Sequence, residues 1–181
     1  MPIPATVALT AEEVDAAMHE IHYARIGTTG PGSRLNMTPM AFSWTGGGVG
    51  KRHIYMWARG QKVANLRRNP ECSVLVDDGE SFARVRAILL HCKGHVLEDS
   101  AAEDSDDYLS EARIELGKKY RVASGPGVNS EEPWPGTARG RSWRWIRLEP
   151  YKIVTWDNKK ITAQGTKSRY ATQMLNGDNR E

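Results

Sequence analysis

Apolar and polar residues alternate along several short stretches of this 181-residue chain. A period of two places successive side chains on opposite faces of a β-strand, so each stretch predicts a strand. Clusters of Gly, Pro, Asn and Asp separate the stretches and predict turns. Pro39 predicts a sheet edge or a bulge in the second strand, and Gly94 predicts a bulge in the fifth. The predicted strands are 23–29, 35–44, 54–57, 72–76, 84–98, 143–148 and 152–156.

Apolar residues three or four positions apart mark helices instead. The first helix, 11–21, is predicted to begin with a capping box, in which the side chains of Thr10 and Glu13 accept hydrogen bonds from free backbone N–H groups at the helix N-terminus. A short helix over 62–68 stops at Asn69 because the residue before a proline disfavours the helical conformation. A further helix is marked by Leu109, Ala112, Leu116 and Tyr120. Many antiparallel strands with few helices predict an α+β fold, mainly antiparallel β, built as a barrel.

The length of the chain suits a single domain, which we expect to span 1–160 and to be followed by a polar C-terminal tail over 161–181. Residues 121–141 are rich in Gly, Pro, Ser and charge and predict a long loop. The net charge of +3 suits an anionic cofactor more than it suits a dedicated nucleic-acid interface. No apolar run approaches the roughly 20 residues of a membrane span, and neither a signal-peptide pattern nor a Cys-x-x-Cys motif is present, so a cytoplasmic protein is expected.

Candidate chemistry lies where the strand at 54–57 gives way to the short helix. Gln61 and Lys62 stand at the helix start, where a cation and free backbone N–H groups point the same way and predict a phosphate site. Thr38, Met56 and Trp57 are expected on strands beside it, where a flat ring can rest. A phosphate site next to a ring platform predicts a nucleotide-like or flavin-like cofactor.

Each of these residues has a plainer interpretation as well. Lys62 suits an exposed surface position, and Trp57 suits a core position. Arg67 and Arg68 are interpreted as solvated helix-face charges or as dimer contacts. The aromatic residues Trp143, Trp145 and Trp156 line a partner's cofactor groove or pack the barrel.

Two apparent motifs do not carry chemistry. The segment GGGVGK, ending at Lys51, lacks the first glycine and the Ser/Thr of a P-loop and precedes a strand rather than a helix, so a hairpin turn is predicted. His91, Cys92 and His95 resemble metal ligands, but residues four apart in a strand are about 13 Å apart, too far to share one ion. No metal site is predicted, and no nucleophile with a placed base is visible.

Three segments of the chain resemble the pyridoxamine 5'-phosphate oxidase-like family of FMN-binding split β-barrels, which includes flavin- and deazaflavin-dependent oxidoreductases. The most specific is HIYMWARGQKVANLRRNPECSVLVDD, with its K-x-x-N-L-x-x-N-P helix. The others are RIGTTGPGSRLNMTPMAFSW and RWIRLEPYKIVTWD. Together the resemblance covers about 20–98 and 142–157.

This resemblance implies a six-stranded split barrel that forms a homodimer, with FMN or the 8-hydroxy-5-deazaflavin coenzyme (coenzyme F-420) in a groove between the subunits. It implies that one strand runs its backbone along the ring edge, that two residues of the next strand flank the cofactor, and that the helix start holds the phosphate. Arg59 is expected to strengthen the phosphate contact. The residues concerned are Asn36, Met37, Thr38, Pro39, Met40, Met56, Trp57, Arg59, Gln61 and Lys62.

The chain departs from the family pattern in two places. Gln61 stands where many relatives carry Arg or Ser, which replaces a charge-assisted contact by a neutral one of roughly half the strength. The Arg-His pattern that holds vitamin B6 substrates is missing near the C-terminus, so vitamin B6 oxidation is not expected. The residues Lys51, Arg52 and Arg59 suit the acidic tail of the deazaflavin, or simply a well-hydrated hairpin.

The leading functional hypothesis is an oxidoreductase that transfers a hydride between a flavin or deazaflavin and an unidentified small organic substrate. The alternative is a non-catalytic protein that binds flavin, deazaflavin or a tetrapyrrole such as heme or biliverdin. A barrel that binds single-stranded nucleic acid has only the basic charge and the tryptophans in its favour. Trp134, in the long loop, is expected either to lie over the groove and contact substrate or ring, or to anchor the loop on the barrel.

Overall fold

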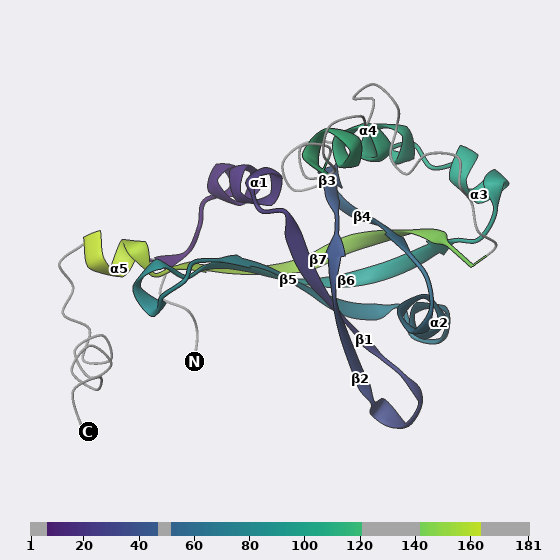
Figure 1. Cartoon of the computed structure of the whole chain (residues 1–181), viewed down its shortest axis with the longest axis horizontal. Helices are drawn as coiled ribbons and strands as arrows, with labels where there is room; N and C mark the ends of the chain where they lie inside the picture. Colours follow the sequence, from purple (N-terminus) through teal and green to yellow (C-terminus); the bar gives the residue numbers. More distant parts are fainter. Residues whose placement is uncertain (1–6, 47–51, 121–141, 164–181) are drawn as a thin grey trace.

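The computed structural model describes residues 7–46, 52–120 and 142–163. Seven strands form one antiparallel sheet in the order β2-β1-β5-β6-β7-β4-β3, curled into a half-barrel (Figure 1). The α+β prediction is confirmed, with seven strands in place of the six that the resemblance implied. The strands are β1 Tyr23–Thr29, β2 Leu35–Ala41, β3 Ser43–Thr45, β4 His53–Ala58, β5 Glu71–Asp78, β6 Arg86–Leu97 and β7 Arg144–Asp157.

Helices cover the sheet in separate places, with α1 on one side and α3 and α4 together at another end (Figure 1). The capping box at Thr10 and Glu13 is formed as predicted, and it fixes the start of α1. No helix in the described part of the chain is long and apolar enough to cross a membrane. The helices are α1 Ala11–Glu20, α2 Gln61–Arg68, α3 Ser100–Asp104, α4 Leu109–Tyr120 and α5 Lys159–Ala163, with 3-10 turns η2 Pro31–Ser33 and η3 Phe82–Arg84.

The division into strands differs from the sequence-based expectation in two places, and the bounds of three other strands shift by one or two residues. The stretch 35–44 is two strands, because Phe42, which lies between β2 and β3 in the chain, donates its N–H to the Tyr120 hydroxyl at 3.0 Å instead of to a neighbouring strand. The stretches 143–148 and 152–156 are one long strand, β7, which pairs with β6 on both sides of Pro150. One extra β7 residue, Tyr151, is accommodated where the register shifts between His91 and Cys92.

The glycine in β6 has a packing role rather than the predicted bulge. Gly94 pairs in regular register with Leu148 of β7, so the bulge prediction at this position is wrong. A Cβ atom on Gly94 would lie 2.8 Å from Cδ2 of Leu66 in α2. The missing side chain lets α2 sit directly on β6.

The core is divided by strand β4, which is buried on both faces. Ile54, Met56 and Ala58 face the barrel interior together with α1 and α2. Tyr55 and Trp57 face the opposite way and pack with α4 and Trp145. Pro39 was predicted at an edge or a bulge, and β2 is indeed an edge strand.

A buried polar cluster joins β4, β7 and the segment before α4. Asp106, whose side chain is 1% exposed, accepts a hydrogen bond from Tyr55 Oη at 2.7 Å and forms an ion pair with Arg147 at 2.9 Å. Burial, and then the hydrogen bond to Asp106, raises the pKa of Tyr55 far above its ordinary value. Arg147 also contacts Glu149 at 2.9 Å, which extends the cluster toward the surface.

Lys119 near the end of α4 gives a pH-dependent contribution to stability. Its Nζ donates to the Met18 carbonyl at 2.7 Å and lies 3.6 Å from the centre of the Phe42 ring. Burial lowers the pKa of Lys119 to about 7, against a smaller opposing effect of Glu115. Between about pH 7 and the ordinary lysine pKa, the unfolded chain therefore holds a proton that the folded chain has released, and stability rises with pH.

We expect the Lys119→Met variant to lose part of the rise in unfolding free energy between pH 7 and pH 9.5. Lys118→Met is the matched control, because its side chain is 68% exposed. Denaturant unfolding at several pH values checks the expectation. A slope as steep in Lys119→Met as in the Lys118→Met control would show that Lys119 does not titrate in this range.

Candidate functional site

The start of α2 is built by a glycine. Gly60 caps the helix with φ of 75°, a left-handed conformation that favours glycine, and no side chain caps the helix there. Val63 and Leu66 face the core as predicted, and Asn65 is also completely buried. The helix therefore lies on the sheet with its first turn open toward the neighbouring β1–β2 turn.

A pocket of about 410 Å³ lies between α2 and the turn that joins β1 to β2. We call it the α2 pocket. It brings together two predicted site residues, Asn36 from the start of β2 and Gln61 from the start of α2. The lining residues are Gly30, Pro31, Arg34, Leu35, Asn36, Gln61, Asn65 and Arg68.

The α2 pocket is cationic. Arg34 and Arg68 line it together with neutral residues, and none of the described lining residues is acidic. Asn65 anchors one side, since its amide donates to Thr28 Oγ1 at 3.0 Å and its carbonyl accepts from Gln61 at 2.7 Å and from Arg68 at 2.8 Å. Arg34 has no ion pair within the described residues. This combination suits an anionic group such as a phosphate.

The other side of the α2 start is electrostatically different. There a second pocket is lined by Arg67 and Arg144. Arg67 holds Glu98 through two hydrogen bonds of 2.7 and 2.6 Å, and Arg144 lies 3.6 Å from the same carboxylate. Because Glu98 offsets one of the two positive charges on this side, the α2 pocket, whose two arginines have no carboxylate among the described lining residues, is the better site for an anion.

Lys62 does not line the α2 pocket. Its Nζ donates to the Arg59 carbonyl at 3.3 Å, so the side chain turns back toward the preceding strand. Burial, and then the nearby charge of Arg59, lowers the pKa of Lys62. The predicted contact between Lys62 and a phosphate stays a prediction.

Met56 and Trp57 point to opposite faces of β4. Met56 is fully buried in the barrel core. Trp57 is 8% exposed and stacks on Trp143 with ring centres 5.9 Å apart, while Trp145 lies 5.2 Å away. Arg59 covers the outer face of Trp143 at 4.9 Å. The two side chains do not form a common platform here, and their role beside a cofactor stays a prediction.

The predicted ring-edge strand, β2, alternates between two faces. Met37 and Pro39 are exposed on the outer face, whereas Asn36, Thr38 and Met40 are partly buried on the inner face. The Thr38 hydroxyl is buried and has no hydrogen-bond partner among the described residues. Among the described strands, β2 is an edge strand that pairs only with β1, and no described strand pairs with its other side.

The part of the chain that the structure describes contains no cluster of three potential metal ligands. His91 lies 3.3 Å from Ser73, and His95 lies 3.3 Å from Glu149 on the neighbouring strand. The hairpin residue Lys51, the loop residue Trp134 and most of the predicted tail lie outside the described residues.

Neither arginine of the α2 pocket was placed at the site from the sequence. Arg68 was interpreted as a solvated helix-face charge or a dimer contact. It is exposed, and it also shares with Gln61 and Asn65, at helical spacing, the face that lines the pocket. Arg34 lies in the turn before β2, and no motif in the sequence marks it as a binding residue. Only the packing of that turn against α2 brings it to the site.

Solved structures with similar folds are numerous. A conserved hypothetical protein from Mycobacterium tuberculosis is 19% identical, with a TM-score of 0.68 over 90% of this chain and 93% of that one. An FAD-binding protein from Mesorhizobium loti is 16% identical, with a TM-score of 0.57 over 82% and 93%. A Listeria innocua protein provisionally named a pyridoxamine 5'-phosphate oxidase is 16% identical, with a TM-score of 0.53 over 80% and 96%.

The fold is that of the pyridoxamine 5'-phosphate oxidase-like split barrels. The same fold occurs in an F-420 reductase (19% identity, TM-score 0.50, 77% and 94% coverage). It also occurs in a heme storage protein from Vibrio cholerae (12% identity, TM-score 0.55, 80% and 93% coverage). No protein-family model and no curated protein sequence matches the chain. At these identities the likeness establishes the fold alone.

Proposed function

We propose that this protein is an oxidoreductase that binds a phosphate-bearing flavin or deazaflavin, FMN or coenzyme F-420, and reduces or oxidises a small organic substrate. The observation that carries the proposal is the α2 pocket. Its two arginines and polar amides stand at the junction of a turn, an edge strand and an open helix start. The fold neighbours that bind FAD or act as an F-420 reductase support the cofactor class.

The protein's share of the work is binding and orientation. Arg34 and Arg68 would hold the cofactor phosphate, with Gln61 and Asn36 as neutral hydrogen-bonding partners. The bound ring system supplies the hydride chemistry. The free side of edge strand β2, from Asn36 to Met40, offers backbone N–H and C=O groups to the polar edge of a ring.

A homodimer is part of this proposal. Leu35 and Met37 on the outer face of β2 are 79% and 67% exposed, and Tyr23 on neighbouring β1 is 59% exposed. Exposed apolar side chains along an unpaired strand edge favour association. We therefore propose that a second copy covers this face and completes the cofactor groove.

We expect light scattering at low micromolar concentration to give twice the chain mass of 20.2 kDa. Met37→Glu should yield monomers, because a carboxylate would be buried without a partner at the interface. Ile114→Glu, at a residue of α4 that is 49% exposed, is the control. A wild-type monomer that binds cofactor fully would rule out a shared groove.

A turnover assay tests the proposed activity. The reduced deazaflavin and reduced FMN are each mixed with a panel of quinones, nitroaromatic compounds and enones, and cofactor absorbance is followed without oxygen. Enzyme-dependent oxidation of a reduced cofactor supports an oxidoreductase. Tight cofactor binding with no acceleration for any acceptor would leave a carrier or sensor as the function.

A second candidate is a tetrapyrrole-binding protein, because one fold neighbour is a heme storage protein. Titration with heme distinguishes this candidate from the first. A sharp Soret band that saturates at one heme per chain, together with no binding of either flavin, would favour it over the oxidoreductase.

A further inference from the structure

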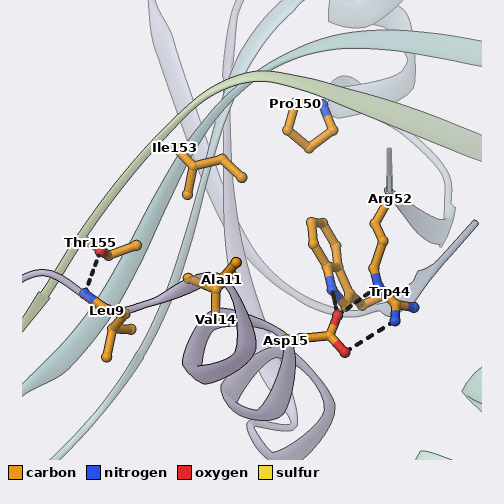
Figure 2. A pocket seen from close by; sticks show the side chains of 9 residues that line it. All are labelled: Leu9, Ala11, Val14, Asp15, Trp44, Arg52, Pro150, Ile153 and Thr155. Carbon is orange, nitrogen blue, oxygen red and sulfur yellow. Dashed lines mark hydrogen bonds and ion pairs between the residues drawn. The ribbon is translucent and has the colours of Figure 1, made fainter. Parts of the chain in front are cut away.

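A second cavity lies away from the α2 pocket and shares no lining residue with it. It has a volume of about 270 Å³ and lies between α1, β3 and β7 (Figure 2). Apolar side chains form most of its wall, among them Val14, Trp44, Pro150 and Ile153. We call it the α1 cavity.

The polar groups around the α1 cavity already bind one another. Asp15 accepts a hydrogen bond from Trp44 Nε1 at 2.9 Å and another from Arg52 Nη2 at 3.0 Å (Figure 2). Arg52 and Asp15 also form an ion pair, with Nε 2.6 Å from the carboxylate. At the other end, the Leu9 N–H donates to Thr155 Oγ1 at 2.9 Å (Figure 2). One negative and one positive charge therefore cancel at the wall, and a ligand needs no charge of its own.

The size of the α1 cavity limits the class of ligand. An apolar protein cavity of about 150 Å³ stays dry and binds benzene. At about 270 Å³, the α1 cavity has room for a substituted ring or for two fused rings. Ile153 borders this space and keeps 44% of its surface exposed, so apolar area remains there for a ligand to cover.

We propose that the α1 cavity is a binding site for a neutral, apolar compound of one or two aromatic rings. The driving force is the burial of apolar surface against Val14, Trp44 and Ile153. A carboxylate on the ligand would lose its hydration and meet a guanidinium that Asp15 already neutralises. This inference does not rest on the proposed oxidoreductase activity.

The experiment uses indole as a neutral two-ring probe, titrated into the full chain and followed by NMR of labelled Ile, Leu and Val methyl groups. The signals of Ile153 and Val14 should shift saturably at millimolar indole or below, whereas the exposed Ile114 signal should not move. Indole-3-carboxylate should bind at least tenfold more weakly. Equal affinities for the two compounds, or no saturable shift at Ile153, would overturn the proposal.

A filling substitution locates the site. Ile153→Trp should abolish indole binding, because the larger side chain occupies the cavity. Ile114→Trp is the matched control, since Ile114 has similar exposure at 49% and lies on α4 outside the cavity. Thermal unfolding of both variants verifies that they fold. Indole binding that persists in folded Ile153→Trp, or disappears in Ile114→Trp, would place the ligand elsewhere.

Discussion

Replacing Arg34 by glutamine is expected to weaken cofactor binding about ten- to hundredfold. Arg34 lines the α2 pocket and has no ion pair within the described residues, so its charge is available to a phosphate. Loss of one charge-assisted hydrogen bond costs about 1.5–3 kcal/mol, which corresponds to that range of affinity. Fluorescence titration of the variant with the cofactor measures the change, and raising the salt concentration should narrow the difference.

Arg84→Gln is the matched control for this substitution. Arg84 is exposed in η3 and does not line the α2 pocket, so its loss removes the same charge from another part of the surface. The control should bind cofactor like the wild-type protein. An Arg34→Gln variant that binds as well as Arg84→Gln would remove the α2 pocket from the cofactor site. Lys62→Ala, measured beside it, tests the contact that the sequence alone predicted.

Replacing Asp106 by alanine is expected to lower the free energy of unfolding by about 3 kcal/mol, the lower end of the range for breaking a buried ion pair. The Asp106 side chain is 1% exposed. Its removal leaves Arg147 without this ion-pair partner and the Tyr55 hydroxyl without its hydrogen-bond acceptor. The low end applies because Arg147 keeps 28% of its side chain in solvent and retains Glu149. Urea denaturation measures the change.

Asp107→Ala provides the control, because the neighbouring carboxylate is exposed. It should alter the unfolding free energy by less than about 0.5 kcal/mol, as surface substitutions usually do. If the Asp106→Ala and Asp107→Ala variants were equally stable, the cluster of Tyr55, Asp106 and Arg147 would not contribute to stability.

The sequence predicted the start of α1 and the bounds of β1 correctly. The capping box at Thr10 fixes the start of α1, and the alternation over 23–29 gives β1 with the predicted bounds. Both depend on residues close together in the chain. The resemblance to split barrels also led to the correct fold. Its most specific segment, K-x-x-N-L-x-x-N-P, contains most of helix α2, which packs on β6 through Leu66.

The sequence could not show features that depend on what packs against an element from a distance. Trp57 and Met56 are both apolar, and only the packing of β7 and α4 against one face of β4 determines that Trp57 is covered. Trp145 lies opposite it in β7, and Trp143 stacks on its ring. A glycine within a strand predicted a bulge at position 94. The structure shows instead that Gly94 makes room for Leu66 of α2. The cationic pocket likewise appears only when the turn carrying Arg34 meets the helix carrying Arg68.

Binding of a phosphate-bearing flavin or deazaflavin can be measured by titrating the purified full chain separately with FMN and with coenzyme F-420. Cofactor fluorescence is followed at equilibrium. We predict saturable binding of at least one of them at one molecule per chain, with an affinity that falls as inorganic phosphate is added. The prediction would be contradicted if the fluorescence of neither cofactor changed saturably, up to the concentration at which free cofactor dominates the signal.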